Sequence, residues 1–559
     1  MLESAPSYLP MDRRHALLAG ATLPAEVTGS ALDADLSGFT ALTEALAAQL
    51  GEQRGAEELA RRLNVLYDAL LTVVHDFHGT VLGFAGDAFS CWFDGDDGRR
   101  AVTCGLALQR CMDRTAPVVA GDLPPPRPKV AVAPGSTRRF LVGDPSVQLL
   151  EGLAGALVDE LAAVAHDALP GEVVLAGSAR TALPGARTGE RGVLLGLDVP
   201  APPDPWPALP DGAESLGAVR PWLLGQVFTR VAAGEGGFVA DLRPATALFL
   251  RMSGIDYEHD PAAEERLDAF VRQVQAVLHE FGGTLVQLTI GDKGSYLYAA
   301  FGAPVAHEDE PVRALLAALD LRPLGGDGGI VEPVSIGATH ARLRAGSYGG
   351  RQRRTYGVLG DAVNLAARLM QAAQPGEVLV TQEPRGRAGA GFSWQDHVHL
   401  QVKGKVAAVP VASLVGALAV VPRPRREQDD GEAPLIGRAV ELQVLQPGLD
   451  RARHGADSVV SVVAEAGMGK TRLVAELVTQ ARLVGHRAVL AECPSYGATT
   501  GYQVWRPVWH ALLGVPQGGP EGTYLADVAA RLGPELAPRL PVLAPLLAEP
   551  VEDNELTRA

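Results

Sequence analysis

Residues 73–93 read VVHDFHGTVLGFAGDAFSCWF, and residues 277–302 read VLHEFGGTLVQLTIGDKGSYLYAAFG. Each stretch begins with a helix end and a glycine turn, continues with an apolar strand and a Gly-Asp turn, and ends with a second apolar strand. The two stretches match in the order of these features over their whole length. The chain of 559 residues therefore contains an internal repeat, and this repeat decides the predicted fold.

The sequence before each stretch extends the repeat. Apolar residues recur there at helical spacing, which predicts a helix that buries one face in each copy. Further upstream, ALDADLSGFT at 31–40 aligns with ALFLRMSGID at 247–256. The separation between equivalent residues is similar at both points, which indicates two copies of one domain of about 180 residues.

Two segments of different composition divide the chain. VPAPPDPWPALP at 199–210 is rich in proline and is predicted to be a linker between the copies. RPRREQDDGE at 423–432 is charged, has no apolar periodicity and is predicted to be a second linker. Strands and helices alternate in all three blocks, which favours α+β or α/β domains. We therefore expect an N-terminal extension at 1–27, a first repeat domain at 28–198, a Pro-rich linker at 199–239, a second repeat domain at 240–417, a linker at 418–432 and a third domain at 433–559.

The composition is that of a globular protein, with 47% hydrophobic and 20% charged residues. The net charge of −16 argues against nonspecific binding to nucleic acid or to an anionic membrane. The four cysteines have no paired CxxC spacing, so neither a zinc site nor a disulfide framework is expected. The N-terminus lacks the apolar core of a signal peptide, and the longest apolar run, 406–421, is interrupted and too short to span a membrane. We expect this run to form a closing strand followed by a linker, and the protein to be cytoplasmic.

Lysine is rare in this chain. The dominance of arginine among the 49 basic residues can reflect genomic base composition alone. At the positions that do have lysine, we expect the compact, rotatable ammonium group to be needed rather than the planar guanidinium group of arginine. The lysines are Lys129, Lys293, Lys403, Lys405 and Lys470.

Two aspartates of the first copy occupy strand ends. Asp35 ends an apolar strand, and Asp87 lies in the Gly-Asp turn between two apolar segments. Carboxylates on neighbouring strands can share a pair of Mg²⁺ ions, which prefer a few carboxylates plus phosphate oxygens. The backbone N–H groups after Asp35 can cradle a triphosphate. The alternative is that both are ordinary turn or cap aspartates. The predicted phosphate-binding residues after Asp35 are Ser37, Gly38, Phe39 and Thr40.

Four segments resemble the motifs of class III adenylyl and guanylyl cyclases. DADLSGFT (33–40) and FAGDAF (84–89) resemble their metal-binding motifs. RRTYGVLGDAVNLAARLM (353–370) resembles their transition-state motif, and VKGK (402–405) resembles their triphosphate-binding segment. The resemblance covers roughly residues 5–417. It implies two α+β, ferredoxin-like domains related by a pseudo-twofold axis, with a site at their interface that holds two Mg²⁺ or Mn²⁺ ions.

The resemblance also implies roles for residues of the second copy. Asn364 and Arg368 are spaced to share one helical face. In the family, the matching Asn orients the ribose, and the matching Arg stabilises negative charge that develops on the α-phosphate. Lys403 or Lys405 would contact the terminal phosphates. The alternative is an amphipathic surface helix with an ordinary arginine.

The two copies differ in complementary ways. In the first copy, Asp159 and Ala163 occupy the positions of the transition-state pair. In the second copy, Arg251 replaces the first metal ligand, although Asp292 still matches Asp87. The chain can therefore assemble one complete site and one degenerate site. Random loss of functional residues would not be expected to keep the metal-binding residues in one copy and the transition-state residues in the other.

The usual purine-reading residues are absent. The family uses a Lys near the Gly-Asp turn and an Asp or Thr before the VN motif, where this chain has Gln287 or Leu288 and Gly357. Gln287 and Gly357 are therefore the candidate purine-binding positions, and the Gln287 amide can both donate and accept. Each lost hydrogen bond costs about 1–3 kcal/mol. Gly83 stands where soluble adenylyl cyclases carry the lysine of a bicarbonate site, so control by bicarbonate is not expected.

A glycine loop lies near the start of the third domain. AEAGMGKT (464–471) fits the phosphate-binding pattern GxxxxGK[ST] except at Ala464, and a strand at 459–463 and a following helix are predicted around it. LIGRAVEL (435–442) resembles the entry motif of STAND signalling ATPases. No acidic Walker B strand end is visible, so we expect an α/β P-loop domain that is truncated and for which hydrolysis is not supported. ATP and Mg²⁺ would bind Gly469, Lys470 and Thr471.

Together these features predict a cyclase in intracellular signalling that converts ATP, with GTP as the second choice, to a 3′,5′-cyclic nucleotide and pyrophosphate. The tandem followed by an ATPase resembles soluble adenylyl cyclases and their bacterial multidomain relatives. A pseudo-cyclase, acting as the nucleotide-sensing module of a STAND-like ATPase, is the second hypothesis. A transcriptional regulator is the third, but no helix-turn-helix or basic patch supports it. The expected partners are the nucleotide, the paired domains themselves and an unidentified regulator, without nucleic acid or a membrane span.

Overall fold

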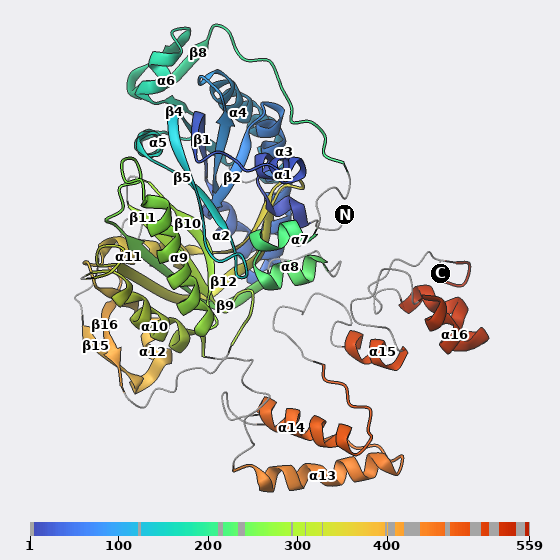
Figure 1. The fold of residues 1–559 in the computed structure, drawn as a ribbon. Coiled ribbons are helices and arrows are strands. Elements are labelled where there is room, and N and C mark those ends of the chain that lie inside the picture. The colour runs from blue at the N-terminus through green and yellow to red at the C-terminus, as the bar shows by residue number, and fades with distance from the viewer. Residues whose placement is uncertain are drawn as a thin grey trace. The chain divides into compact units, whose positions relative to one another are not determined.

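The computed structural model of the chain consists of two compact units, Met1–Pro424 and Arg425–Ala559 (Figure 1). Each unit is described by itself. The described residues are 5–120, 125–210, 216–232, 241–291, 294–307, 309–326, 328–396, 400, 408–418, 437–463, 470–491, 505–513, 525–543 and 554–557.

The first copy of the repeat forms a six-stranded sheet with the order β2-β3-β1-β4-β5, in which β6 also pairs with β4. The glycine turn and the Gly-Asp turn predicted in the opening stretch separate α3, β2 and β3, as expected from the sequence. The strands are β1 (Glu26–Ser37), β2 (Thr80–Ala85), β3 (Ala88–Asp94), β4 (Arg127–Val142), β5 (Leu150–Ala154) and β6 (Val173–Leu175).

The second copy repeats this arrangement in an eight-stranded sheet with the order β10-β11-β9-β12-β14-β16-β15, and β13 pairs with β12. Figure 1 draws the first sheet in blue to teal and the second in green to orange. The predicted closing strand in the run 406–421 is confirmed as β16. The strands are β9 (Asp241–Met252), β10 (Thr284–Thr289), β11 (Ser295–Phe301), β12 (Ser335–Gly349), β13 (Arg354–Leu359), β14 (Val378–Thr381), β15 (Phe392–Asp396) and β16 (Val411–Ala417).

The apolar faces of the predicted helices pack in the cores of the two copies. In α3, Leu63, Leu66 and Leu70 are at most 2% exposed and pack in the core of the first copy. In α9, Leu267, Phe270 and the following apolar residues pack in the core of the second. The main helices of the unit are α1 (Met11–Ala19), α2 (Phe39–Leu50), α3 (Glu52–Asp76), α4 (Arg99–Ala120), α5 (Ala156–Asp167), α8 (Gly225–Ala232), α9 (Ala263–Glu280), α10 (Glu310–Leu321), α11 (Asp361–Ala372) and α12 (Gln382–Ala388).

Hydrogen bonds join the β12–β13 hairpin to the first copy. Arg353 is buried at its tip, where Nε donates to the carbonyl of Val81 at 3.0 Å and Nη2 donates to the carbonyl of Leu82 at 2.8 Å. Close by, Arg351 Nε donates to Asp68 Oδ2 on α3 at 2.8 Å. These contacts fix the hairpin of the second copy against α3 and β2 of the first.

The β4–β5 hairpin makes the corresponding contacts with the second copy. The backbone N–H of Gly143 donates to Asp268 Oδ1 on α9 at 2.7 Å, and that of Asp144 donates to Gln275 Oε1 at 2.8 Å. The backbones of β5 and β10 also lie in contact. Each copy therefore extends its hairpin onto the long helix of the other.

The second unit differs from the prediction. The expected strand at 459–463 is wrong, because these residues have no regular structure and Val459 and Val463 are 98% and 88% exposed. A strand needs a neighbour for its backbone hydrogen bonds, and no strand is found among the described residues of this unit. The helix predicted after the glycine loop is confirmed as α14 (Lys470–Leu483). The other α-helices are α13 (Ala439–Arg453), α15 (Arg506–Leu513) and α16 (Leu525–Leu536).

Among the described residues, no helix has both the length and the apolar character that crossing a membrane would need.

Candidate functional site

Strand register places Asp35 beside the turn that carries Asp87. On β1, Asp35 is directly opposite Ala88 of β3, and Asp87 is the residue before Ala88. The Asp87 backbone carbonyl accepts a hydrogen bond from the Tyr67 hydroxyl of α3 at 3.3 Å, which holds the turn against the helix. The two predicted metal-binding residues therefore lie on neighbouring strand ends of one sheet.

The Asp35 carboxylate acts on the ionisation of Asp87. Burial and, to a smaller extent, the nearby Asp35 carboxylate raise the pKa of Asp87 to about 6, although Lys129 acts in the opposite direction. A like charge in a partly buried site opposes the ionisation of Asp87, and a divalent cation bound there would relieve that opposition. Asp35 and Asp87 therefore fit the predicted metal pair. Among the described residues, no group of three or more His, Cys, Asp or Glu side chains has the arrangement of a metal site.

Lys129 belongs to this site, although the sequence analysis did not select it. It lies on β4 directly opposite Asp35, and its Nζ is 3.3 Å from Asp35 Oδ2. Both side chains are partly exposed, at 30% and 40%, so this ion pair is weak and the ammonium can turn to another anion. The scarcity of lysine in the chain was the signal that could have identified it.

The segment after Asp35 turns sharply into α2. Ser37 ends β1, and its buried hydroxyl has no hydrogen-bond partner within the described part of the chain. Gly38 has φ = 96°, a conformation that side chains disfavour, and α2 begins at the next residue, Phe39. The turn leaves the first backbone N–H groups of α2 at the end of β1. Phe39 and Thr40 lie in this first turn, and their side chains are outside the described set.

The predicted transition-state pair lies on α11. Val363, Ala366 and Leu369 bury one face of this helix against the second sheet. Asn364 is exposed and Arg368 is half-buried, one helical turn apart on the remaining surface. The structure thus gathers Asp35, Asp87 and Lys129 in the first copy, and Asn364 with Arg368 in the second.

The two candidate purine positions, Gln287 and Gly357, lie on β10 and β13, which are in contact. The Gln287 amide donates from Nε2 to Thr289 Oγ1 at 2.8 Å, and Gln287 lines a cavity of about 140 Å³ that Gly83 also lines. Gly357 lies on β13, and a Cβ there would approach a Tyr348 ring carbon at 2.7 Å. Because the Tyr348 ring covers Gly357, the structure does not support a direct purine contact from that position.

Some predicted residues cannot be placed. Lys403 and Lys405 lie outside the described residues, as does Gly469 of the glycine loop. Lys470 is the first residue of α14, and Thr471 follows it, with its side chain also outside the described set.

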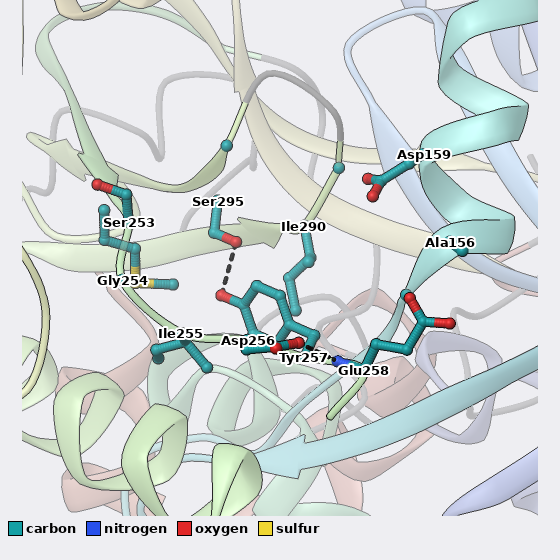
Figure 2. Close-up of a pocket in the computed structure, with 14 residues that line it drawn as sticks. Ala156, Asp159, Ser253, Gly254, Ile255, Asp256, Tyr257, Glu258, Ile290 and Ser295 are labelled. Carbon is teal, nitrogen blue, oxygen red and sulfur yellow. Dashed lines mark hydrogen bonds between the residues drawn. The ribbon is translucent and has the colours of Figure 1, made fainter. Parts of the chain in front are cut away.

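A second cavity of about 320 Å³ lies where the degenerate site was expected (Figure 2). The start of α5, including Asp159, lines one side, and residues 252–258 line the other. Figure 2 shows Tyr257 beside Ser295, and their hydroxyl oxygens are 2.6 Å apart. Arg251 Nη2 donates to Ser335 Oγ at 3.3 Å, and no Arg or Lys is among the described lining residues.

Comparison with known proteins supports both predicted resemblances. The model of the AAA ATPase domain family matches residues 434–551. Adenylate cyclase type 10 of Homo sapiens is 25% identical over 388 residues, which cover 60% of this chain and 23% of that protein. The Oryctolagus cuniculus protein of the same name is 23% identical over 506 residues, covering 81% of this chain and 31% of its own length. The chain thus spans about a quarter to a third of the length of these curated relatives.

Among solved structures, a class III adenylyl cyclase-like ATP-binding protein from Pseudomonas aeruginosa is 14% identical, with a TM-score of 0.46. The match covers 66% of this chain and 86% of that protein. The predicted combination of cyclase-like repeats with a P-loop ATPase segment is confirmed by the family and relative matches.

Proposed function

We propose that the two repeats, 28–198 and 240–417, form one nucleotidyl cyclase that converts a purine nucleoside triphosphate to a 3′,5′-cyclic nucleotide and pyrophosphate. The names of the relatives favour ATP, the substrate expected from the sequence. The reciprocal hairpin contacts support a pseudo-twofold pair of domains with a site at their interface. Leu359, two residues before the start of α11, packs against the core of the first copy, which supports a position of α11 near that interface.

In this proposal, residues of both copies share the chemistry. Asp35 and Asp87 would hold two Mg²⁺ ions, which supply charge neutralisation and lower the pKa of the substrate 3′-hydroxyl. Lys129, the Ser37 hydroxyl and the backbone after Gly38 bind the triphosphate. Lys403 or Lys405 adds a further contact to the terminal phosphates.

The second copy would act at the reacting phosphorus. Arg368 places a fixed cation where negative charge develops on the α-phosphate during attack by the 3′-hydroxyl. Asn364, one helical turn before it, orients the ribose so that the 3′-hydroxyl faces the phosphorus. Neither role can be filled in the degenerate site, where Asp159 and Ala163 occupy these positions.

The observation that carries the proposal is the difference between the side chains of the two sites. The first has two neighbouring carboxylates, Asp35 and Asp87, with an ammonium 3.3 Å from Asp35. The second has Asp159 where the complete site has Asn364 and Ala163 where it has Arg368, and its Arg251 donates to Ser335 Oγ and to the Ala373 carbonyl. If selection maintains one site, the functional residues are expected to be lost only from the other site.

A pseudo-cyclase is the second candidate function, and Tyr348 favours it. Its ring covers Gly357, where the family carries a purine reader. A protein that binds nucleotides without turning them over would tolerate such a change. In both cases, we propose that the segment 433–559 binds ATP and Mg²⁺ through Lys470 and Thr471 and that the whole protein works in cytoplasmic signalling with an unidentified partner.

Product formation separates the two functions. The purified chain is incubated with ATP or GTP and with Mg²⁺ or Mn²⁺, and the cyclic nucleotide is measured beside Asp87→Asn. The cyclase proposal predicts product from the wild type and a loss of about 100-fold or more in the variant, since metal-site carboxylates carry several kcal/mol of transition-state stabilisation. Nucleotide binding with no product above the variant would support the pseudo-cyclase.

A further inference from the structure

Arg344 is a buried cation whose side-chain donors find no acceptor within the described part of the chain. It lies on β12, is 7% exposed, and its Nε, Nη1 and Nη2 atoms have no hydrogen-bond partner among the described residues. Burial lowers the pKa of its guanidinium. An arginine held in this way is strongly unfavourable unless another group accepts its hydrogen bonds, so the position calls for a ligand.

The register of the hairpin places Arg344 between the two copies. Arg344 is directly opposite Leu359, and Gly346 is opposite Gly357. Directly opposite residues share a face of the sheet, so Arg344, Tyr348, Gly357 and Leu359 all lie on one face. Tyr348 and Leu359 pack against the first copy, and therefore this face is turned toward that copy.

The groups around Arg344 are aromatic and neutral. Tyr348 and Tyr67 are the ionisable groups that act on its charge, and burial raises the pKa of both hydroxyls. Their rings lie 6.2 Å apart, and the Phe84 ring is 5.6 Å from Tyr67. These surroundings suit a flat, uncharged ring better than a phosphate.

The region of the site that would bind the phosphates is separate from the surroundings of Arg344. Lys129 acts on the charges of Asp35 and Asp87 there. Tyr67 connects the two places, since its hydroxyl donates to the Asp87 carbonyl while its ring lies in the aromatic group near Arg344. A nucleotide whose phosphates lie at Lys129 would therefore have its base on the side of Arg344.

We propose that Arg344 binds O6 and N7 of a guanine base, so that the site prefers GTP to ATP; this inference rests on the proposed cyclase function and reverses the preference expected from the sequence. The planar guanidinium group of arginine carries only hydrogen-bond donors. Guanine presents two adjacent acceptors, O6 and N7, whose spacing matches two of these donors. Adenine presents an amino donor beside N7, so one arm of the fork would face another donor.

A second buried polar atom is an acceptor that could receive a hydrogen bond from the base. Asn64 Oδ1 has no hydrogen-bond partner in the described part of the chain. Asn64 lies one helical turn before Tyr67 on the same face of α3. Guanine carries donors at N1 and N2 as well as its two acceptors, whereas a phosphate carries acceptors alone.

The catalytic test compares kcat/KM for GTP and ATP in the wild type, Arg344→Leu and Arg344→Lys. Arg342→Leu is the matched control, because Arg342 is an exposed arginine on the same strand. We expect the wild type to prefer GTP by at least about tenfold. Arg344→Leu should lower the value for GTP by at least about tenfold while that for ATP stays within about threefold. A wild-type preference for ATP, or an equal loss for both nucleotides, would overturn the inference.

Binding distinguishes this inference from the cyclase proposal itself. The 3′-deoxy forms of GTP, ATP, ITP and 7-deaza-GTP cannot cyclise, and each is titrated in the Lys470→Ala background so that the P-loop contributes little. Because ITP keeps O6 and N7, it should bind as tightly as GTP, and 7-deaza-GTP should bind about tenfold more weakly. If no protein makes cyclic nucleotide but this binding order holds, the cyclase proposal fails and the role of Arg344 stands. Indistinguishable binding of all four analogues would overturn that role.

Thermal unfolding gives a readout that a purely structural arginine would not produce. Arg344→Leu removes an unpaired buried cation, so we expect the Tm of the nucleotide-free protein to rise. We also expect the increase in Tm caused by 3′-deoxy-GTP to be largely lost in this variant. A lower Tm together with an unchanged increase from 3′-deoxy-GTP would mean that Arg344 only supports the fold.

Discussion

The ammonium of Lys129 lies 3.3 Å from the carboxylate of Asp35, directly across the β1–β4 pair. This cation neutralises part of the charge at the predicted metal pair before any substrate is bound. Because the pair is partly exposed, little free energy holds the ammonium there. We infer that Lys129 turns toward the triphosphate when metals occupy Asp35 and Asp87.

Replacement of Lys129 by Met should separate metal affinity from substrate affinity. Without the ammonium, the carboxylates should bind Mn²⁺ more tightly in the absence of nucleotide, while KM for the triphosphate should rise by about 5- to 50-fold. Mn²⁺ titration and steady-state kinetics measure the two effects. Arg187→Met, which removes a highly exposed cation, is the control. A fall in both affinities would mean that Lys129 only supports the local fold.

Arg353 should contribute much more to stability than its neighbour Arg351. Its donors reach the carbonyls of Val81, Leu82 and Tyr8, which would be left unsatisfied in Arg353→Met. We expect a loss of about 3 kcal/mol or more in the free energy of unfolding. Arg351→Met breaks an exposed ion pair with Asp68 and should cost less than about 1 kcal/mol. Urea unfolding compares the two, and equal losses would contradict the tethering role of Arg353.

His340 should make the protein less stable in mild acid. It is buried on β12 with Nδ1 2.9 Å from Thr246 Oγ1, and burial, followed by Arg387, lowers its pKa to about 4. The unfolded chain takes up this proton near pH 6.5, whereas the folded chain does not. Its contribution is therefore present above pH 6.5 and is lost as the pH falls toward 4.

The unfolding free energy of the wild type should fall by about 1–2 kcal/mol more than that of His340→Gln between pH 7 and pH 5. His259→Gln, in which the replaced ring is exposed, should keep the wild-type slope. Parallel pH profiles for the wild type and His340→Gln would rule out this contribution.

The repeat and its elements could be predicted from the sequence because their signals are local. Glycine turns, the Gly-Asp turns and apolar periodicity mark the ends and buried faces of α3, β2 and β3 in both copies. The segment at 459–463 has a similar apolar character but forms no strand. An apolar run specifies a strand only where a neighbouring strand accepts its hydrogen bonds, and this depends on tertiary contacts.

The candidate site was only partly predictable for the same reason. Asp35 near the end of β1 and Asp87 in a Gly-Asp turn belong to recognisable sequences, whereas Lys129 becomes part of the site through strand pairing. Arg344 alternates with apolar residues on β12, which favours an exposed side chain. It is buried because the other copy covers this face of the hairpin, and no local pattern contains that contact.

The most direct test of the central claim compares matched changes in the two sites of the purified chain of 559 residues. Asp35→Ala and Arg368→Ala alter the complete site from opposite copies, and Asp159→Ala alters the degenerate site at the position that matches Asn364. Cyclic nucleotide formation should fall by about 100-fold or more in each of the first two and change by less than about threefold in the third. Equal activity in the wild type and Arg368→Ala, or an equally large loss in Asp159→Ala, would contradict a single site built from complementary halves.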